Sequence, residues 1–255
     1  MKKAPDQFPA HVYSNKQIWI RSLSSFAVLI LLFTGGWMGF KWIRKQPRDN
    51  GTPAPLRKVL VMNEKIFSSY FDSNRLVKEF PLSAAVKNVR VNGSAGMSDA
   101  VDTATWRLKV ARSNGDTLML SLDDIKKLPK KDIVFEFKCI EGWSQVTHWA
   151  GVPFRSFVKA YHLDQEKAMK YIGLQTPDKK YYVGIDMPSA MQEQTLLCYE
   201  MNGNPLPLNQ GFPLRLIIPV KYGIKHLKRI GTLFFSDTKP ADYWAERGYD
   251  YYSGH

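Results

Sequence analysis

The sequence predicts an α+β fold: a mixed, strand-rich domain that follows one transmembrane helix. Short segments rich in β-branched and aromatic residues indicate strands, and helical periodicity is confined to a few irregularly placed stretches. Near the N-terminus, 19 uncharged residues separate Arg21 from Lys41, enough to cross about 30 Å of hydrocarbon as a helix. The expected strands are 106–111, 117–120, 133–138, 181–185, 195–201, 214–220 and 231–236.

Composition divides the chain into four segments. We expect a polar tail over 1–17, a transmembrane anchor helix over 18–43, a solvated linker over 44–55 and one domain over 56–255. A cleaved signal peptide is the alternative interpretation of the apolar segment. Its apolar core is usually shorter, and no A-x-A-like cleavage site follows here, so an uncleaved anchor is favoured.

The positive charge of the chain is concentrated around the apolar segment. Residues 1–58 carry ten Lys or Arg and two Asp or Glu, so they hold +8 of the net +13. Basic flanks of a membrane helix are favoured by anionic lipid headgroups. No fold signature of nucleic-acid binding accompanies the charge, so we do not expect a nucleic-acid partner.

Two cysteines are too few for a disulfide framework. Cys198 lies inside an apolar strand-like run and is expected to be a buried packing residue. Cys139 instead closes an expected strand and begins C-I-E-G-W-S, followed by T-H-W-A-G-V-P-F. A thiol at the mouth of a buried strand is well placed to bind a metal or attack a substrate.

The stretch from 137 to 154 and a second run, N-G-N-P-L-P-L-N-Q-G-F-P-L-R-L-I-I-P-V-K-Y-G-I-K-H-L-K, carry a family resemblance. Together they resemble the sulfite oxidase superfamily of molybdopterin-dependent oxidoreductases, and most of all its bacterial protein-methionine-sulfoxide reductase catalytic subunits. Two long matches in the right order are far more specific than one short motif. The resemblance implies a sulfite-oxidase-type molybdopterin-binding domain. It extends from Asn63 to the C-terminus and is strongest after Cys139.

The resemblance also implies a cofactor and its contacts. In this superfamily one molybdopterin holds molybdenum through its dithiolene, and one protein thiolate, here Cys139, completes the sulfur ligands. Soft sulfur ligands suit such a centre. Gln210 stands where relatives often have asparagine. The residues matched to cofactor-binding positions are Asn63, Cys139, Thr176, Gln210, Arg215, His226, Leu227 and Lys228.

Glu141 is the position that bears on the substrate. Sulfite-oxidising members carry a loop with an arginine near this position, whereas this chain has a carboxylate, which repels an anion. Glu141 is therefore a candidate proton donor for the reduction of a neutral oxide, with a surface glutamate as the alternative. Trp143 and Trp149 would add apolar walls, or belong to the core.

The sequence thus indicates a membrane-anchored molybdopterin-dependent oxidoreductase that transfers an oxygen atom, with a sulfoxide or similar small-molecule or protein-bound oxide as substrate. The alternatives are oxidation of sulfite or another small compound, and a catalytically silent tethered binding module. The histidines show no paired spacing for zinc, haem or iron. We therefore expect electrons from a separate membrane cytochrome. By resemblance, the catalytic domain is expected on the periplasmic side of the inner membrane.

Overall fold

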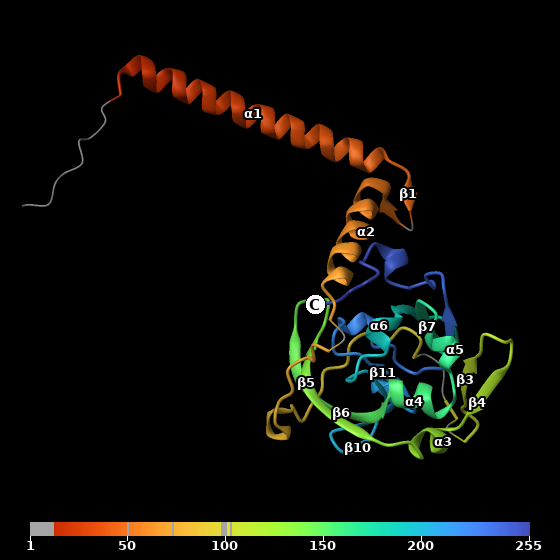
Figure 1. The fold of residues 1–255 in the computed structure, drawn as a ribbon. Helices are drawn as coiled ribbons and strands as arrows, with labels where there is room; N and C mark the ends of the chain where they lie inside the picture. The colour runs from red at the N-terminus through yellow and green to blue at the C-terminus, as the bar shows by residue number, and fades with distance from the viewer. Residues whose placement is uncertain (1–12, 50, 73, 98–100, 103) are drawn as a thin grey trace, which may run out of the picture.

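A long helix stands out from a mixed α/β domain in the computed structural model, which describes residues 13–49, 51–72, 74–97, 101–102 and 104–255 (Figure 1). Helix α1 (Asn15–Lys45) begins at Ser14, whose hydroxyl accepts a hydrogen bond from the Gln17 backbone. None of its residues is buried. The helix is long and apolar enough to cross a membrane, so it is either an anchor or a signal sequence. Residues 1–12 of the expected polar tail lie outside the described residues.

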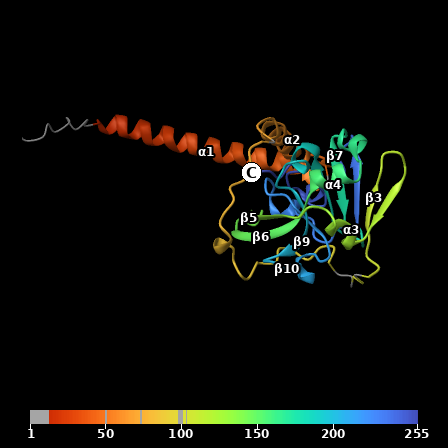
Figure 2. The same cartoon turned by 60° about the horizontal axis from the view of Figure 1, so that its bottom comes forward.

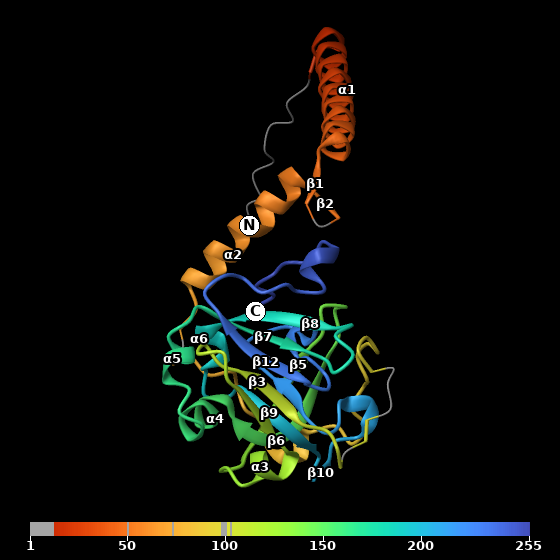
Figure 3. The same ribbon diagram turned by 90° about the vertical axis from the view of Figure 1, so that its right-hand side faces the viewer.

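The segment expected to be a solvated linker contains regular structure. Strands β1 (Arg48–Asp49) and β2 (Thr52–Pro53) form a short antiparallel hairpin. Helix α2 (Ala54–Ser69) follows at once, with a proline in its first turn, where the missing N–H costs nothing. No sequence pattern predicted α2. Figure 3 shows α2 between α1 and the domain, running across the direction of α1.

Two five-stranded sheets build the domain. In the first, the order is β10-β9-β6-β5, with β11 also paired to β9; in the second, it is β4-β3-β12-β7-β8. All pairings are antiparallel except that of β12 with β3. Figure 2 shows the two sheets on opposite sides of the domain. The strands are β3 (Leu108–Ala111), β4 (Thr117–Leu120), β5 (Lys131–Lys138), β6 (Ser144–Pro153), β7 (Tyr171–Gln175), β8 (Tyr182–Asp186), β9 (Leu196–Met201), β10 (Asn204–Pro205), β11 (Arg215–Ile217) and β12 (Thr232–Ser236).

Short helices join these strands and cover their ends. The apolar spacing after Pro153 predicts a helix, and α4 confirms it. The α-helices of the domain are α3 (Leu122–Lys126), α4 (Phe154–Ala160), α5 (Asp164–Lys167) and α6 (Met187–Ala190), and the 3-10 helices are η1 (Leu82–Ala84), η2 (Leu208–Gln210), η3 (Gly223–Lys225) and η4 (Ala245–Arg247).

All seven expected strands are present, with ends that differ by up to three residues. Five strands lie outside the expected ranges: β1, β2 and β10, which have two residues each, and the longer β6 and β7. Strand β6 is the longest of the chain, but Gly151 and Pro153 near its end are unfavourable in a strand interior, and they hid it. A side chain at Gly151 would collide with the backbone of β9, so the close approach of β6 and β9 requires glycine there.

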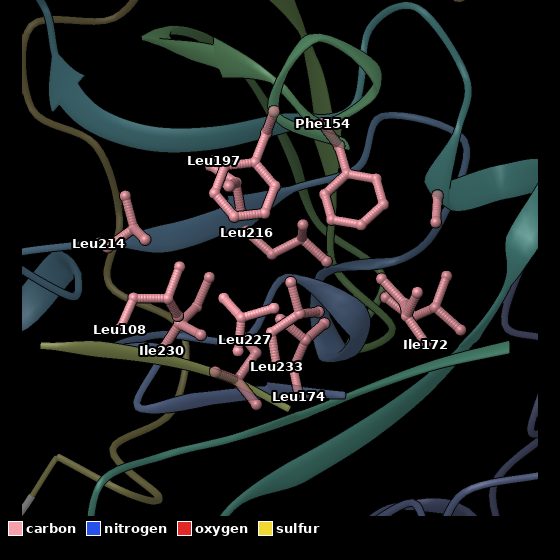
Figure 4. Close-up of a cluster of buried hydrophobic side chains, with 14 of the residues drawn as sticks. Leu108, Phe154, Ile172, Leu174, Leu197, Leu214, Leu216, Leu227, Ile230 and Leu233 are labelled. Atoms are coloured by element: carbon pink, nitrogen blue, oxygen red, sulfur yellow. The ribbon is translucent and has the colours of Figure 1, made fainter. Parts of the chain in front are cut away.

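The main hydrophobic core lies between the two sheets (Figure 4). Leu174 and Leu233 reach it from the second sheet, and Leu197 and Leu216 from the first. The residues that alternate with them in the first sheet, such as Cys198 and Ile217, belong to a second buried cluster, which also contains Cys139. The first sheet is therefore buried on both faces, and Cys139 lies at the end of its outer strand, β5.

Candidate active site

A cavity of about 290 Å³ lies where the polypeptide leaves β5. Segments that are far apart in the sequence meet there, and both apolar rings and polar atoms reach its surface. Such a concave site with a few convergent polar groups is the usual form of a ligand-binding pocket. Its walls are formed by Asn92, Gly93, Ser94, Ala95, Cys139, Ile140, Glu141, Tyr181, Gly223, Ile224, His226, Lys228, Trp244 and Tyr249.

Cys139 provides the one sulfur atom in this wall. A tight turn fixes the residue: its N–H donates to the carbonyl of Trp143 at 2.9 Å, and its own carbonyl accepts from the Gly142 N–H at 3.1 Å. Gly142 has φ +86°, a conformation that favours glycine. Burial raises the pKa of the Cys139 thiol, so the sulfur is held neutral unless a cation shares its site. The turn thus presents a thiol to the cavity.

Cys198, by contrast, lies away from the cavity. It is fully buried on β9, opposite Arg215 of β11. Burial raises the pKa of its thiol to about 12. The structure therefore places Cys198 as a packing residue, and both cysteines are free thiols.

Arg215 is a buried cation without an acidic partner among the described residues. Its Nη1 donates to the backbone and side-chain oxygens of Gln210, at 3.0 and 2.9 Å, and its guanidinium lies over the ring of Trp149. Its Nε and Nη2 make no hydrogen bond to the residues that the structure describes. Burial lowers the pKa of Arg215 to about 10. A buried guanidinium with free N–H groups is suited to an anionic or strongly polar ligand.

Lys228 adds a second cation beside Arg215, since the two residues pair across an antiparallel bridge. Its Nζ donates to the carbonyls of Asn92 and Gly93. Burial, and then the charge of Arg215, lower its pKa to about 7. Arg215 and Lys228 meet no carboxylate within the described part of the chain, so an anion bound here would relieve the cost of burying them.

His226 and Leu227 complete the matched three-residue run. The Nδ1 of His226 accepts from the Ile218 N–H, and its Nε2 faces the Lys221 carbonyl at 3.1 Å, which assigns the proton to Nε2. Burial lowers the pKa of His226 to about 3, so the ring is neutral and rigid. Leu227 points into the main core and holds the run in place.

An ion pair connects the two walls of the cavity beside this run. Lys225 of η3 bonds to Asp242 and to the carbonyl of Gly184, and both charged side chains are buried. Asp242 leads into the segment that supplies Trp244 and Tyr249. Tyr181 also lines the cavity and bonds to the segment that carries Lys225, because its hydroxyl donates to the Ile224 carbonyl at 2.6 Å. These contacts set the width of the cavity.

Other expected site residues lie at the rim or elsewhere. Glu141 is exposed at the cavity mouth, where its carboxylate accepts from Trp143 Nε1 at 2.9 Å. Thr176 is buried and bonds to the backbone of Tyr181 rather than facing the cavity. Asn63 is on α2 and is not among the residues that form the walls.

Of the wall residues, only Cys139, Glu141, His226 and Lys228 were predicted from the sequence. Asn92, Tyr181, Trp244 and Tyr249 are the largest side chains among those that were not. Asn92 is the most central of them, since its carbonyl accepts from Lys228 and its amide donates to Gly223. The turn-forming Asn92-Gly93-Ser94 was its only signal. No pattern links the aromatic C-terminal residues to Cys139, because tertiary contacts alone bring them together.

The comparisons with known proteins agree with this arrangement. Residues 95–244 match the oxidoreductase molybdopterin binding domain family. A putative protein-methionine-sulfoxide reductase subunit, YedZ1, of Azospira oryzae is 34% identical over 208 residues, which cover 81% of this chain and 78% of that protein. The catalytic subunit MsrP of Campylobacter jejuni is 30% identical over 165 residues, covering 59% and 56%, and that of Xanthomonas campestris is 32% identical over 152, covering 54% and 47%.

The chain thus spans about half the length of these two MsrP relatives. A crystal structure of the sulfane dehydrogenase SoxCD from Paracoccus pantotrophus shares the fold, with a TM-score of 0.50 and 17% identity over 56% of this chain and 41% of that one. Fold and matches together define a molybdopterin-binding oxidoreductase. The chain belongs to the oxidoreductase molybdopterin-binding domain family and is related to the methionine-sulfoxide reductases.

The family implies a molybdenum cofactor, and the cavity fits one. No group of three or more His, Cys, Asp or Glu side chains that could hold a metal occurs in the parts of the chain described. A metal here would need most of its ligands from an organic group, with Cys139 as the protein's sulfur. The unpaired N–H groups of Arg215 and the cation of Lys228 suit the anionic and polar parts of such a group.

Lys228→Met should remove a pH dependence of stability between pH 7 and about 10. Because burial holds the pKa of Lys228 at about 7, the unfolded chain binds a proton in this range that the folded protein does not. The free energy of unfolding of the cofactor-free wild type should therefore rise with pH there, by up to about 1.4 kcal/mol per pH unit. Urea titrations across the range would measure the slope.

Lys109→Met, on an exposed position of β3, is the matched control and should keep the wild-type slope. Lys221, whose pKa burial lowers to about 8, contributes in the same direction in all three proteins. The difference between variants therefore isolates Lys228. Equal slopes in the wild type and in Lys228→Met would show that the buried lysine keeps its proton.

Proposed function

We propose that this protein reduces a sulfoxide, with methionine sulfoxide in proteins as the substrate class that the names of its relatives suggest. The observation that supports this most directly is a single turn-held thiol, Cys139, in a cavity whose wall also carries the buried Lys228. Arg215 pairs with Lys228 but lies outside that wall, and neither cation has an acidic partner among the described residues. The reaction consumes two electrons and two protons, breaks the S–O bond, and releases the sulfide and water.

In this proposal each part of the cavity has one task. Cys139 ligates the molybdenum, and Arg215 and Lys228 hold the anionic and pterin parts of the cofactor. Bound there, the cofactor supplies a centre that takes up an oxygen atom and cycles by two electrons. Gln210 orients Arg215 through its two oxygens, and its own amide donates to the carbonyl of Val89. His226 keeps the wall at Cys139 rigid through its stacking on Phe135 and its T-shaped contact with Phe137.

The mouth of the cavity favours a neutral substrate over an anion. The exposed carboxylate of Glu141 repels sulfite, whereas Trp244 and Tyr249 offer apolar surface to a thioether side chain. Trp149, expected as a possible wall, lies in the core under Arg215 instead. Sulfite oxidation is therefore the second candidate function, and the charge at position 141 disfavours it.

We also propose that α1 is an uncleaved anchor and that the domain works on the periplasmic side, with a membrane cytochrome as electron donor. The support is that α1 is uncharged over residues 22–40 and that no residue of it is buried. Trp19 lies near one end, and Trp37 and Trp42 near the other, as interfacial aromatics do. An anchor would keep the cavity near a donor in the same membrane.

Cys139→Ala should abolish sulfoxide reduction with a viologen dye as electron donor, because the metal loses its only protein ligand. The fold and the bound pterin should remain, since Arg215 and Lys228 are unchanged. Cys198→Ala is the matched control and should stay active. Activity, molybdenum content and the number of Mo–S bonds from X-ray absorption would be measured together. Full activity of Cys139→Ala, or one fewer Mo–S bond in Cys198→Ala, would contradict the assignment. Wild-type protein that is purified with no molybdenum would instead indicate a silent binding module.

Arg215→Met should lower the cofactor content without destabilising the cofactor-free domain. Removing a buried cation that has no carboxylate partner in the described chain relieves its desolvation, so the free energy of unfolding should stay equal or rise. Arg112→Met is the control, and its stability and cofactor content should change in the opposite way. Arg112 neutralises the buried Glu166, and neither residue lines the cavity. This variant should lose stability and keep the cofactor. A stable Arg215→Met protein with full cofactor occupancy would refute the cofactor role of Arg215.

Glu141→Gln tests how the rim selects the substrate. The exposure of Glu141 and its bond to Trp143, which an amide oxygen can also accept, favour a charge effect. We expect sulfoxide turnover to change by less than about threefold, while sulfite binds several-fold more tightly because one repulsive charge is gone. A loss of about 10²-fold in sulfoxide turnover would show instead that this carboxyl donates a proton in the reaction.

A further inference from the structure

Helix α2 exposes an apolar face that no other part of the described chain covers. Its inner side, with Arg57, Leu60 and Glu64, faces the C-terminal segment around 239–251. At the C-terminal end of α2, Phe67 and Tyr70 border a cavity that Val220 and Tyr252 of the domain also line. At 3.6 residues per turn, the exposed apolar residues on the outer side of the helix fall on one stripe along it. They are Leu56 (44% exposed), Val59 (48%), Met62 (53%), Ile66 (43%) and Phe67 (58%), followed by Tyr70 (81%) at the C-cap. The stripe, here called the α2 apolar face, is longer than scattered surface apolar residues require.

The position of α2 limits what can cover this face. The Ala54 N–H donates to the Pro47 carbonyl at 2.9 Å, so α2 begins beside the residue that lies two positions beyond the end of α1. Figures 1 and 3 show that α2 then runs across the direction of α1 and lies between α1 and the domain. If α1 crosses a bilayer, α2 starts at the bilayer surface and extends along it.

The charges around this face match an anionic surface. Arg44 and Lys45 form the last turn of α1, and Lys58 and Lys65 are exposed on α2 to one side of the apolar face. Glu64, the acidic residue of α2, is on the inner side and pairs with Lys239. A helix with an apolar face, aromatic side chains and flanking lysines is the pattern of a helix that lies in a lipid interface.

We propose that α2 is an interfacial helix, which inserts its apolar face into the headgroup and acyl boundary of an anionic bilayer and seats the domain against the membrane. The proposal rests on the membrane insertion of α1 proposed above. The chain then contacts lipid at two places. Helix α1 tethers the chain, and helix α2 fixes the orientation of the domain. A protein helix or a second copy of the chain are the other possible occupants of the face.

Spin labels in the full chain would test this. Single cysteines replace Val59, Met62 and Ile66 on the apolar face, with Lys58→Cys and Lys65→Cys as matched controls on the same helix. Leu31→Cys reports on α1. The wild type, whose two cysteines are buried, is treated with the same label to measure the background signal. The proteins are reconstituted in vesicles of phosphatidylglycerol and phosphatidylethanolamine, and collision rates with oxygen and with a water-soluble nickel complex give the depth of each label.

We expect labels at 59, 62 and 66 to lie about 5–10 Å below the headgroups and those at 58 and 65 to lie in water. If the label at 31 is deep in lipid but all α2 labels are in water, the interfacial helix is refuted and the anchor stands. If apolar-face labels are shielded from both oxygen and nickel, a protein covers the face and lipid docking is also refuted. If the label at 31 is in water, the anchor is refuted, and the depths at 59, 62 and 66 still decide the case of α2.

Discussion

The ion pair between Lys225 and Asp242 is the contact on which the rest of the cavity depends. Both groups are almost fully buried, and a charge at that depth is tolerated only with its partner in place. Lys225 comes from the run that also supplies His226 and Lys228, and Asp242 leads into the aromatic C-terminal wall. One electrostatic contact therefore joins the wall that carries His226 and Lys228 to the wall that carries Trp244 and Tyr249.

The polar groups of the site are of two kinds. Some make their hydrogen bonds within the protein, and others keep groups that no described residue meets. Gln210 and His226 find all their partners within the fold and serve as supports. Arg215 keeps N–H groups that no described residue meets, and burial weakens the hold of Lys228 on its proton. Buried polar groups without partners lower the stability of the fold. Proteins keep such groups mainly where a bound ligand offsets that loss. The same reasoning separates the two thiols, since Cys139 faces the cavity and Cys198 faces the core.

Sequence patterns predicted most of the longer strands, but few of the residues that line the cavity. Strands such as β12, with boundaries predicted to within one residue, carry a local signal in their β-branched and aromatic residues. Strand β6 contains Gly151, which its close packing against β9 requires, and Pro153 at its end. Both residues are unfavourable in strands, so the local sequence of β6 does not indicate one. The Cys139 loop and the run around Arg215 are contiguous motifs and were found. Asn92 and Trp244 come to the cavity only through the folded topology, which a local pattern does not contain. Helix α2 was missed because its proline and short polar neighbours are typical of a linker.

Arg57 links helix α2 to the wall of the cavity. From α2, its guanidinium donates to the carbonyl of Ala245 at 2.6 Å and to that of Tyr249, so it clamps the backbone of the segment that bears Trp244. Helix α2 is thus a structural brace for this wall of the cavity. A truncated form of this enzyme that lacks α1 has to be cut upstream of Ala54, because a shorter fragment would lose the contacts that hold the wall in place.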